Sequence, residues 1–197
     1  MADTVIGVVG KDFVIMAADK SRARSIVIMS NEEEKIMNLQ THKLLGASGP
    51  SGDCAQFCDF IQKNLNLYHF RTDVPLSTQA AANFTRHQLA TALRKSPYNC
   101  NLLLGGFDKD EGPSLYFMDY LASLQQVKYG VQGYASYFLL SIFDKNYRPE
   151  MSVEEVLALL KICFAELRTR FLINSPVFSI KIVDRDGIRV IDPELVV

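Results

Sequence analysis

The sequence lacks an excess of charge of either sign. Its 21 lysine and arginine residues are balanced by 22 aspartate and glutamate residues, which gives a formal net charge of -1. A protein whose main ligand is nucleic acid usually shows a basic excess or a basic cluster, because it must neutralise phosphates. The balance therefore argues against nucleic acid as the main ligand. The densest run of one sign is Glu32, Glu33 and Glu34, which is typical of a solvated loop.

Long hydrophobic runs and targeting signals are also missing. No apolar run approaches the length that crosses a bilayer, and the first residues lack the positive start of a signal peptide. Cysteine is scarce, and all four residues lie in otherwise apolar segments: Cys54, Cys58, Cys100 and Cys163. Without a secretion signal we expect these cysteines to be reduced, buried thiols. The expected compartment is therefore the cytoplasm or the nucleus.

Metal and cofactor sites have little support. Cys54 and Cys58 would share one face of a helix, but no second pair follows at the spacing of a metal site. The glycine-rich residues 46–52 lack the Lys-Ser or Lys-Thr pair of a phosphate-binding loop, and Pro50 removes one backbone donor. We expect no metal ion and no cofactor, and a nucleotide-binding module remains a minor alternative that depends on this loop alone.

The three histidines do not suggest a catalytic triad. His42, His69 and His87 are scattered, and none has a cysteine, serine or aspartate partner at a suggestive spacing. Structural or solvated roles are expected for all three.

The residues that are present suit one compact domain over residues 1–197. The chain is 48% hydrophobic, so a sizeable core can form without disulfides. Short apolar, β-branched runs predict strands, and apolar residues repeated at intervals of three and four predict helices. The predicted strands cover residues 4–9, 13–18, 35–39, 43–48, 101–107, 114–119, 177–183 and 188–191. The first predicted helix covers residues 53–70, and the second begins at the cap Ser77 and ends at Ser96. The third covers residues 133–144, and the fourth begins at a capping box formed by Ser152 and Glu155.

This order of elements indicates the fold class. Strands, two helices, strands, two helices and strands follow one another in separate groups rather than in alternation. Such grouping favours layered α+β packing, with sheets between pairs of helices.

Asp19 ends one predicted strand and Lys35 begins another. A lysine near a carboxylate can help a catalytic base whose pKa is tuned, but a structural salt bridge explains the same two residues. The residues alone leave both interpretations open.

Several longer segments resemble the proteasome beta-subunit family. Ala17-Ala18-Asp19-Lys20, Lys35-Ile36 and residues 48–53 match its early strands and helix entry, and residues 147–152 look like its Tyr-Arg-Pro-x-Met-Ser segment. The resemblance covers essentially the whole chain. A finer resemblance exists to one non-catalytic type of beta subunit, which occupies the fourth position of the beta ring. It is carried by residues 52–71 (GDCAQFCDFIQKNLNLYHFR), 80–94 (AAANFTRHQLATALR) and 101–122 (NLLLGGFDKDEGPSLYFMDYLA).

The resemblance implies the N-terminal-nucleophile hydrolase fold, a four-layer sandwich of two antiparallel sheets between helix layers. Active members use an N-terminal threonine whose hydroxyl attacks the peptide carbonyl, while its own amine helps to move the proton. Carried over to this chain, the family's tuning aspartate falls on Asp19, its lysine on Lys35 and its oxyanion-binding glycine on Gly49. The nucleophile position then falls on Asp3, and a carboxylate is a poor attacker of amides.

A second group of family residues is incomplete as well. Ser136 matches the first serine of the family's serine-aspartate-serine group, but Phe171 and Asn174 stand where the aspartate and the other serine belong. The resemblance therefore implies a structural subunit without catalytic residues, with Asp19, Lys35, Gly49 and Ser136 as remnants. It would assemble with other proteasome alpha and beta subunits in a barrel of four rings that degrades ubiquitin-tagged proteins. The enzymatic alternative is that processing exposes Thr4 as the nucleophile.

Overall fold

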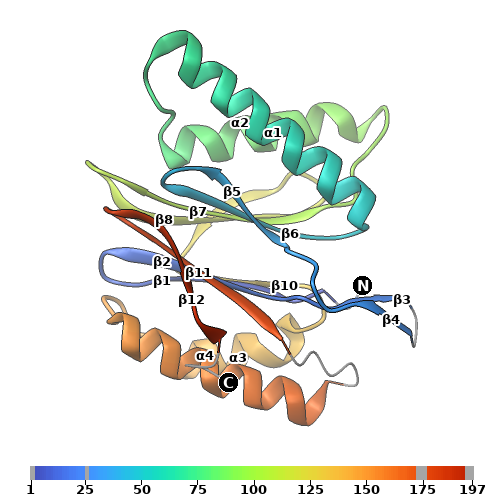
Figure 1. Ribbon diagram of the computed structural model, residues 1–197, viewed down its shortest axis with the longest axis vertical. Helices are drawn as coiled ribbons and strands as arrows, with labels where there is room; N and C mark the ends of the chain where they lie inside the picture. Colours follow the sequence, from blue (N-terminus) through green and yellow to red (C-terminus); the bar gives the residue numbers. More distant parts are fainter. Residues whose placement is uncertain (1–2, 25–26, 172–176, 194–197) are drawn as a thin grey trace.

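Four layers of secondary structure make up the chain. The computed structural model describes residues 3–24, 27–171 and 177–193. Helices α1 and α2 form one outer layer, helices α3 and α4 form the other, and two antiparallel sheets lie face to face between them (Figure 1). The layered α+β fold with two sheets between helix pairs is thereby confirmed.

The sheet next to α3 and α4 has the strand order β10-β1-β2-β11-β12. The bounds of its strands are β1 Val5–Val9, β2 Phe13–Asp19, β10 Tyr129–Gln132, β11 Phe178–Asp184 and β12 Gly187–Ile191. All residues of β1 and β2 are buried, as continuous apolar runs predict for strands that are covered on both faces.

The sheet next to α1 and α2 has the order β5-β6-β7-β8-β9. Its strands are β5 Ile36–Gln40, β6 Lys43–Ser48, β7 Asn101–Asp108, β8 Gly112–Met118 and β9 Leu124–Val127. A separate two-stranded ribbon, formed by β3 Arg22–Arg24 and β4 Val27–Ser30, projects from the body on the side where the N-terminus lies (Figure 1).

Two helices begin after a serine whose side chain accepts a hydrogen bond from a backbone N–H of the first turn. The bounds of the helices are α1 Ser51–Thr72, α2 Thr78–Leu93, α3 Ser136–Asn146 and α4 Val153–Arg170. The Ser77 side chain accepts a hydrogen bond from the Ala80 N–H, and Ser152 and Glu155 form the predicted capping box. None of the helices, over the residues that can be described, is long and apolar enough to cross a membrane.

Four strands were not predicted. Strands β3 and β4 form a ribbon whose visible side chains in β4 are exposed or half-buried, so no buried face imposes a periodic pattern. Strands β9 and β10 lie in residues 124–132, where glutamines and a lysine interrupt the apolar residues. Helix α3 begins at Ser136 rather than at Gly133, because Gly133 adopts a positive φ of 83° that a helix does not allow.

Each pair of adjacent layers encloses a hydrophobic core. Val5, Met16 and Leu103 belong to the core between the two sheets. Phe57 and Leu104 belong to the core under α1 and α2, and the third core includes Phe164 and Phe178, whose rings stack at 3.9 Å. The cores hold the ends of β1, β2 and β6 in one place, and the candidate site lies there.

Candidate functional site

The pairing of β1 with β2 brings the start of the described chain to Asp19. Val5 is opposite Ala18 in the ladder, and the Asp19 N–H extends it by donating to the Thr4 carbonyl at 3.2 Å. The Thr4 N–H donates in turn to Asp19 Oδ1 at 2.7 Å. Asp19 is only 2% exposed. The residue after Asp3 is thus fixed to the buried carboxylate through its backbone.

Lys35 enters the site from the residue before β5. Its ammonium group lies 2.8 Å from Asp3 Oδ1 and donates to Asp19 Oδ2 at 2.9 Å and to the Ser21 carbonyl at 2.8 Å. An ammonium group has three N–H donors. Each donor of Lys35 therefore has an acceptor, and the predicted Asp19–Lys35 contact is a buried ion pair.

The charge of Lys35 is maintained by its two carboxylate neighbours. Burial lowers the pKa of Lys35, but attraction to Asp19 and Asp3 and the hydrogen bonds to both outweigh this effect, so its pKa is raised. Lys35 is therefore a cation at neutral pH. It has no proton to accept and no free N–H for an incoming group.

The second oxygen of the Asp3 carboxylate faces Gly49. The Gly49 N–H donates to Asp3 Oδ2 at 3.3 Å. Gly49 follows β6 and precedes α1, so the end of a strand and the beginning of a helix position this amide together. One carboxylate thus bridges the Lys35 ammonium group and the amide that the resemblance assigns to oxyanion binding.

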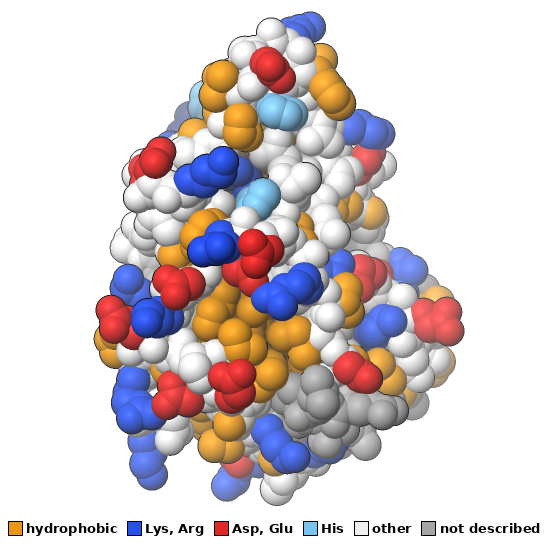
Figure 2. All heavy atoms as spheres, turned by 60° about the vertical axis from the view of Figure 1, so that its left-hand side comes forward, with side chains coloured by type: hydrophobic (Ala, Val, Ile, Leu, Met, Phe, Trp, Pro, Cys, Tyr) orange, Lys and Arg blue, Asp and Glu red, His pale blue; other side chains and the backbone are white. Residues whose placement is uncertain are grey.

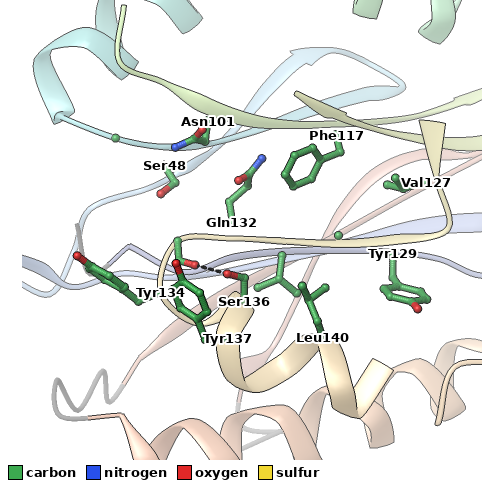
Figure 3. A pocket seen from close by; sticks show the side chains of 14 residues that line it. Ser48, Asn101, Phe117, Val127, Tyr129, Gln132, Tyr134, Ser136, Tyr137 and Leu140 are labelled. Atoms are coloured by element: carbon green, nitrogen blue, oxygen red, sulfur yellow. Dashed lines mark hydrogen bonds between the residues drawn. The ribbon is translucent and has the colours of Figure 1, made fainter. Parts of the chain in front are cut away.

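Gly133, which directly follows β10, lies against the backbone of Asp3. A methyl group at Gly133 would overlap the Asp3 carbonyl oxygen, so only glycine permits this approach at a positive φ. Ser136, at the start of α3, donates its hydroxyl to the Gly133 carbonyl at 2.8 Å (Figure 3). Ser136 is therefore linked to the site through Gly133.

The two other positions of the serine-aspartate-serine group do not add a described polar contact. Phe171 is half-buried at the end of α4, and its ring packs against Phe138 with centroids 6.2 Å apart. It belongs to the apolar surroundings of the core under α3 and α4. Asn174 lies outside the described residues.

Two cavities meet at Gly49. One, of about 150 Å³, is lined by Asp3, Lys35, Gly49 and Cys54 among others. The other is about 520 Å³, and Figure 3 shows Ser48, Gln132 and Ser136 around it. Over the described residues, no histidine lines either cavity.

The arrangement places a buried ion pair beside the position that the resemblance assigns to the nucleophile. Asp3 is engaged through both oxygens, and its carboxylate has no hydroxyl or thiol to activate. The structure brings Asp3, Asp19, Lys35 and Gly49 together, and the roles that the resemblance assigns to them stay predictions. Prediction from the sequence missed Ser21, which contributes only a backbone carbonyl, and Gly133, which contributes only space. An isolated glycine between Gln132 and Tyr134 was the single available sign of a close backbone approach.

Comparison with known proteins agrees with this geometry. The family model described as "Proteasome subunit" matches residues 1–183. Proteasome subunit beta type-2 of Oryza sativa subsp. japonica is 54% identical over 187 residues, which cover 95% of this chain and 88% of the rice protein. Proteasome subunit beta type-2-B of Arabidopsis thaliana is also 54% identical, over 95% of this chain and 94% of its own length. Proteasome subunit beta type-4 of Saccharomyces cerevisiae is 40% identical over 192 residues, or 96% of this chain and 97% of the yeast protein.

Proposed function

The chain belongs to the proteasome subunit family, and from this premise we propose that it is a non-catalytic beta subunit of the 20S core particle. It helps to enclose the proteolytic chamber and cleaves no peptide itself. Its relatives named beta type-2 support this assignment within the family. In this proposal the subunit takes the fourth position of the beta ring and contacts alpha and beta subunits in the four-ring barrel.

The carboxylate of Asp3 is the observation that carries the proposal. It occupies the position that belongs to the nucleophile in active members, and it forms contacts with Lys35 at 2.8 Å and Gly49 at 3.3 Å. These contacts use the cation and the amide that an active site needs for proton transfer and oxyanion binding. The remnants therefore act as a structural network in which Lys35 neutralises Asp3 and Asp19.

The alternative nucleophile, Thr4, is in the wrong place. It is 2% exposed, and both its N–H and its carbonyl are hydrogen-bonded to Asp19. Because successive side chains of an extended chain point to opposite faces, the Thr4 side chain points away from the side that Asp3 occupies. A catalytic Thr4 would need a one-residue slip of the strand, which would move every apolar side chain of β1 to the other face.

Exposed apolar side chains support a role in assembly. Val27, Ile28 and Met29, which are consecutive in β4, are 59%, 48% and 63% exposed, respectively. Contiguous exposed apolar side chains typically mark protein contacts. The face in Figure 2 shows basic and acidic side chains intermingled around a hydrophobic area, without a continuous field of one sign. Other protein subunits fit this surface better than nucleic acid does.

We extend the proposal to the cytoplasm and nucleus as the compartments. All four cysteines are free thiols, which suits a reducing environment.

Copurification tests the assignment. The full chain, tagged at its C-terminus, is isolated from its own cells, and the complex is examined by native gel and by mass spectrometry of the intact assembly. We expect alpha and beta subunits of the core particle in equal amounts with the tagged chain. A tagged chain that is found only as a free protein would contradict the proposal.

A further inference from the structure

Three cysteines gather beneath the first turns of α1. Cys54 and Cys58 are four residues apart on the helix, and Cys100 directly precedes β7. Cys58 and Cys100 are buried members of the core under α1 and α2, and Cys54 packs against the same core. The neighbouring Cys54 side chain and burial together raise the pKa of the Cys100 thiol. All three are free thiols.

The backbone independently places Cys54 beside the segment that carries Cys100. A methyl group at Gly49 would lie 2.9 Å from Cys54 Sγ and would overlap the Asn99 carbonyl oxygen. The Asn99 N–H also donates to Asp53 Oδ2 at 3.1 Å. Residues 99–100 are therefore held against the beginning of α1, where Cys54 lies.

The cluster does not suit a metal ion. Over the described part of the chain, no group of three or more histidine, cysteine, aspartate or glutamate side chains is arranged to hold one. Burial raises the pKa of Cys58 to about 12, so its thiol stays protonated at neutral pH. The chemistry that these side chains can share is therefore a reaction between two of their sulfur atoms.

The three thiols differ in their access to solvent. Cys54 is half-buried and, like Cys58, lines the cavity of about 150 Å³ at the candidate site, whereas Cys100 is 0% exposed. Cys54 lies at the beginning of α1, at the edge of this cavity. Cys54 is therefore the thiol that a reagent meets first, and Cys100 is the thiol held behind it.

The cavity also selects the reagent. Its lining includes the carboxylates of Asp3, Glu33 and Glu34 against one ammonium group, that of Lys35. A negative lining disfavours anionic reagents such as glutathione disulfide, and the small volume excludes large ones. A small neutral hydroperoxide satisfies both conditions.

We propose that Cys54 and Cys100 are a peroxide-reactive thiol pair that closes to a disulfide. Cys54 Sγ attacks one peroxide oxygen, an S–O bond forms as the O–O bond breaks, and the other oxygen leaves as water or an alcohol with the thiol proton. Cys100 Sγ then attacks the sulfenic sulfur, and the S–S bond forms as the S–O bond breaks. The hydroxyl leaves as water with the Cys100 proton. The pair is oxidised by two electrons, and the hydroperoxide is reduced.

Peptide mapping of the full chain tests the proposal, whether the chain is free or assembled. The protein is treated with hydrogen peroxide, free thiols are blocked, and the chain is digested with trypsin without reduction. Cleavage after Lys43 and Lys63 gives residues 44–63, which contain Cys54 and Cys58, and cleavage after Lys95 and Lys109 gives residues 96–109, which contain Cys100. We expect these two peptides to become linked with the loss of two hydrogen atoms, and dithiothreitol to reverse the link.

Three variants show which sulfur atoms react. Cys54→Ala should abolish the linked peptide, whereas Cys58→Ala and the distant Cys163→Ala should leave it in place. A link that survives in Cys54→Ala but is lost in Cys58→Ala would overturn the proposal. So would oxidation of Cys54 to sulfinic acid in the wild-type chain without any link to Cys100. In a parallel sample with glutathione disulfide, we expect little mixed disulfide at Cys54. A mixed disulfide there, without a peroxide-induced link, would also contradict the proposal.

Discussion

The Asp3 carboxylate lies 2.8 Å from the Lys35 ammonium group, with side chains that are only 17% and 5% exposed. The buried carboxylate of Asp19 and the half-buried carboxylate of Asp3 share this cation. Burial of such groups is costly unless they are paired, so the stability of the site depends on the presence of all three. In the proposed function, this contact fills the position of the nucleophile with a carboxylate that is held by Lys35.

Replacement of Lys35 by methionine should destabilise the fold. The change leaves the buried Asp19 and the half-buried Asp3 without their cation, and we expect a loss of about 3–5 kcal/mol in the free energy of unfolding. Urea denaturation of the isolated chain, or its yield in assembled particles, measures the effect. Lys63→Met is the matched control, since its pair with Asp59 is 73% and 49% exposed and should change stability by less than about 0.5 kcal/mol. A selective loss of peptidase activity in assembled Lys35→Met particles would contradict a purely structural role.

The stabilising contribution of the Lys35 charge in the wild-type chain should not change through titration of Lys35 itself between pH 6 and pH 9. The folded-state pKa of Lys35 is raised above the ordinary value of 10.5, so its stabilising contribution is complete below 10.5 and is lost only as the pH rises through the folded pKa. Equilibrium unfolding at several pH values within that range tests the expectation.

Asp3 and Lys35 should be energetically coupled. Asp3→Asn alone removes the charge that faces Lys35 and should lower stability by about 1–3 kcal/mol. In the Lys35→Met background the same change removes an uncompensated carboxylate, so it should cost less or be stabilising. The double-mutant cycle should therefore give a coupling of about 0.5–3 kcal/mol. Additive effects would mean that the two side chains do not interact in solution.

Gly133 should tolerate alanine much less well than Gly112 does. Both glycines have positive φ, 83° and 74°, but a methyl group at Gly133 overlaps the Asp3 carbonyl oxygen, whereas one at Gly112 meets nothing within 4 Å. Gly112→Ala should cost about 1–2 kcal/mol from backbone strain alone. Gly133→Ala should cost about 1–3 kcal/mol more, because the chain must shift to remove the overlap. Thermal unfolding of both variants measures the difference, and equal costs would argue against close contact of Asp3 with Gly133.

The buried Cys163 thiol should make stability fall at alkaline pH. Burial raises its pKa from 9.0 to about 12, so between these values the unfolded chain loses the thiol proton while the folded chain keeps it. Folding stability from this group therefore decreases above pH 9 by about 1.4 kcal/mol per pH unit. Cys163→Ala lacks the effect, so the difference in unfolding free energy between wild type and variant should narrow from pH 8 to pH 10.5. A constant difference would contradict the raised pKa.

Local sequence patterns predicted most of the fold, because burial makes apolar residues recur at the spacing of a strand or a helix. The strand residues of β1 and β2 are all buried, and the apolar stripe of α4 follows helical spacing. Strand β10 escaped prediction because its partner, β1, is distant in the sequence. Strand β9 pairs with the preceding strand β8 but escaped because glutamines interrupt its apolar residues. The β3–β4 ribbon escaped because its visible residues in β4 have no buried face.

The candidate site was predictable only through a family framework. Asp19, Lys35 and Gly49 are far apart in the chain, and nothing local to any of them indicates a shared location. The family framework identified Asp3 as a replacement of the nucleophile. The contacts of the Asp3 carboxylate with Lys35 and the Gly49 N–H depend on the direction of its side chain, which the spacing of residues does not specify. Ser21 contributes a backbone carbonyl, a role that any residue type can fill.

Labelling of the assembled particle tests the central claim most directly. Purified particles that contain this chain are treated with an electrophile that acylates N-terminal threonines, and the intact mass of every subunit is measured. We predict that catalytic subunits gain the label, whereas this chain retains Asp3 and remains unlabelled. A chain that begins at Thr4 and carries the label would contradict the account.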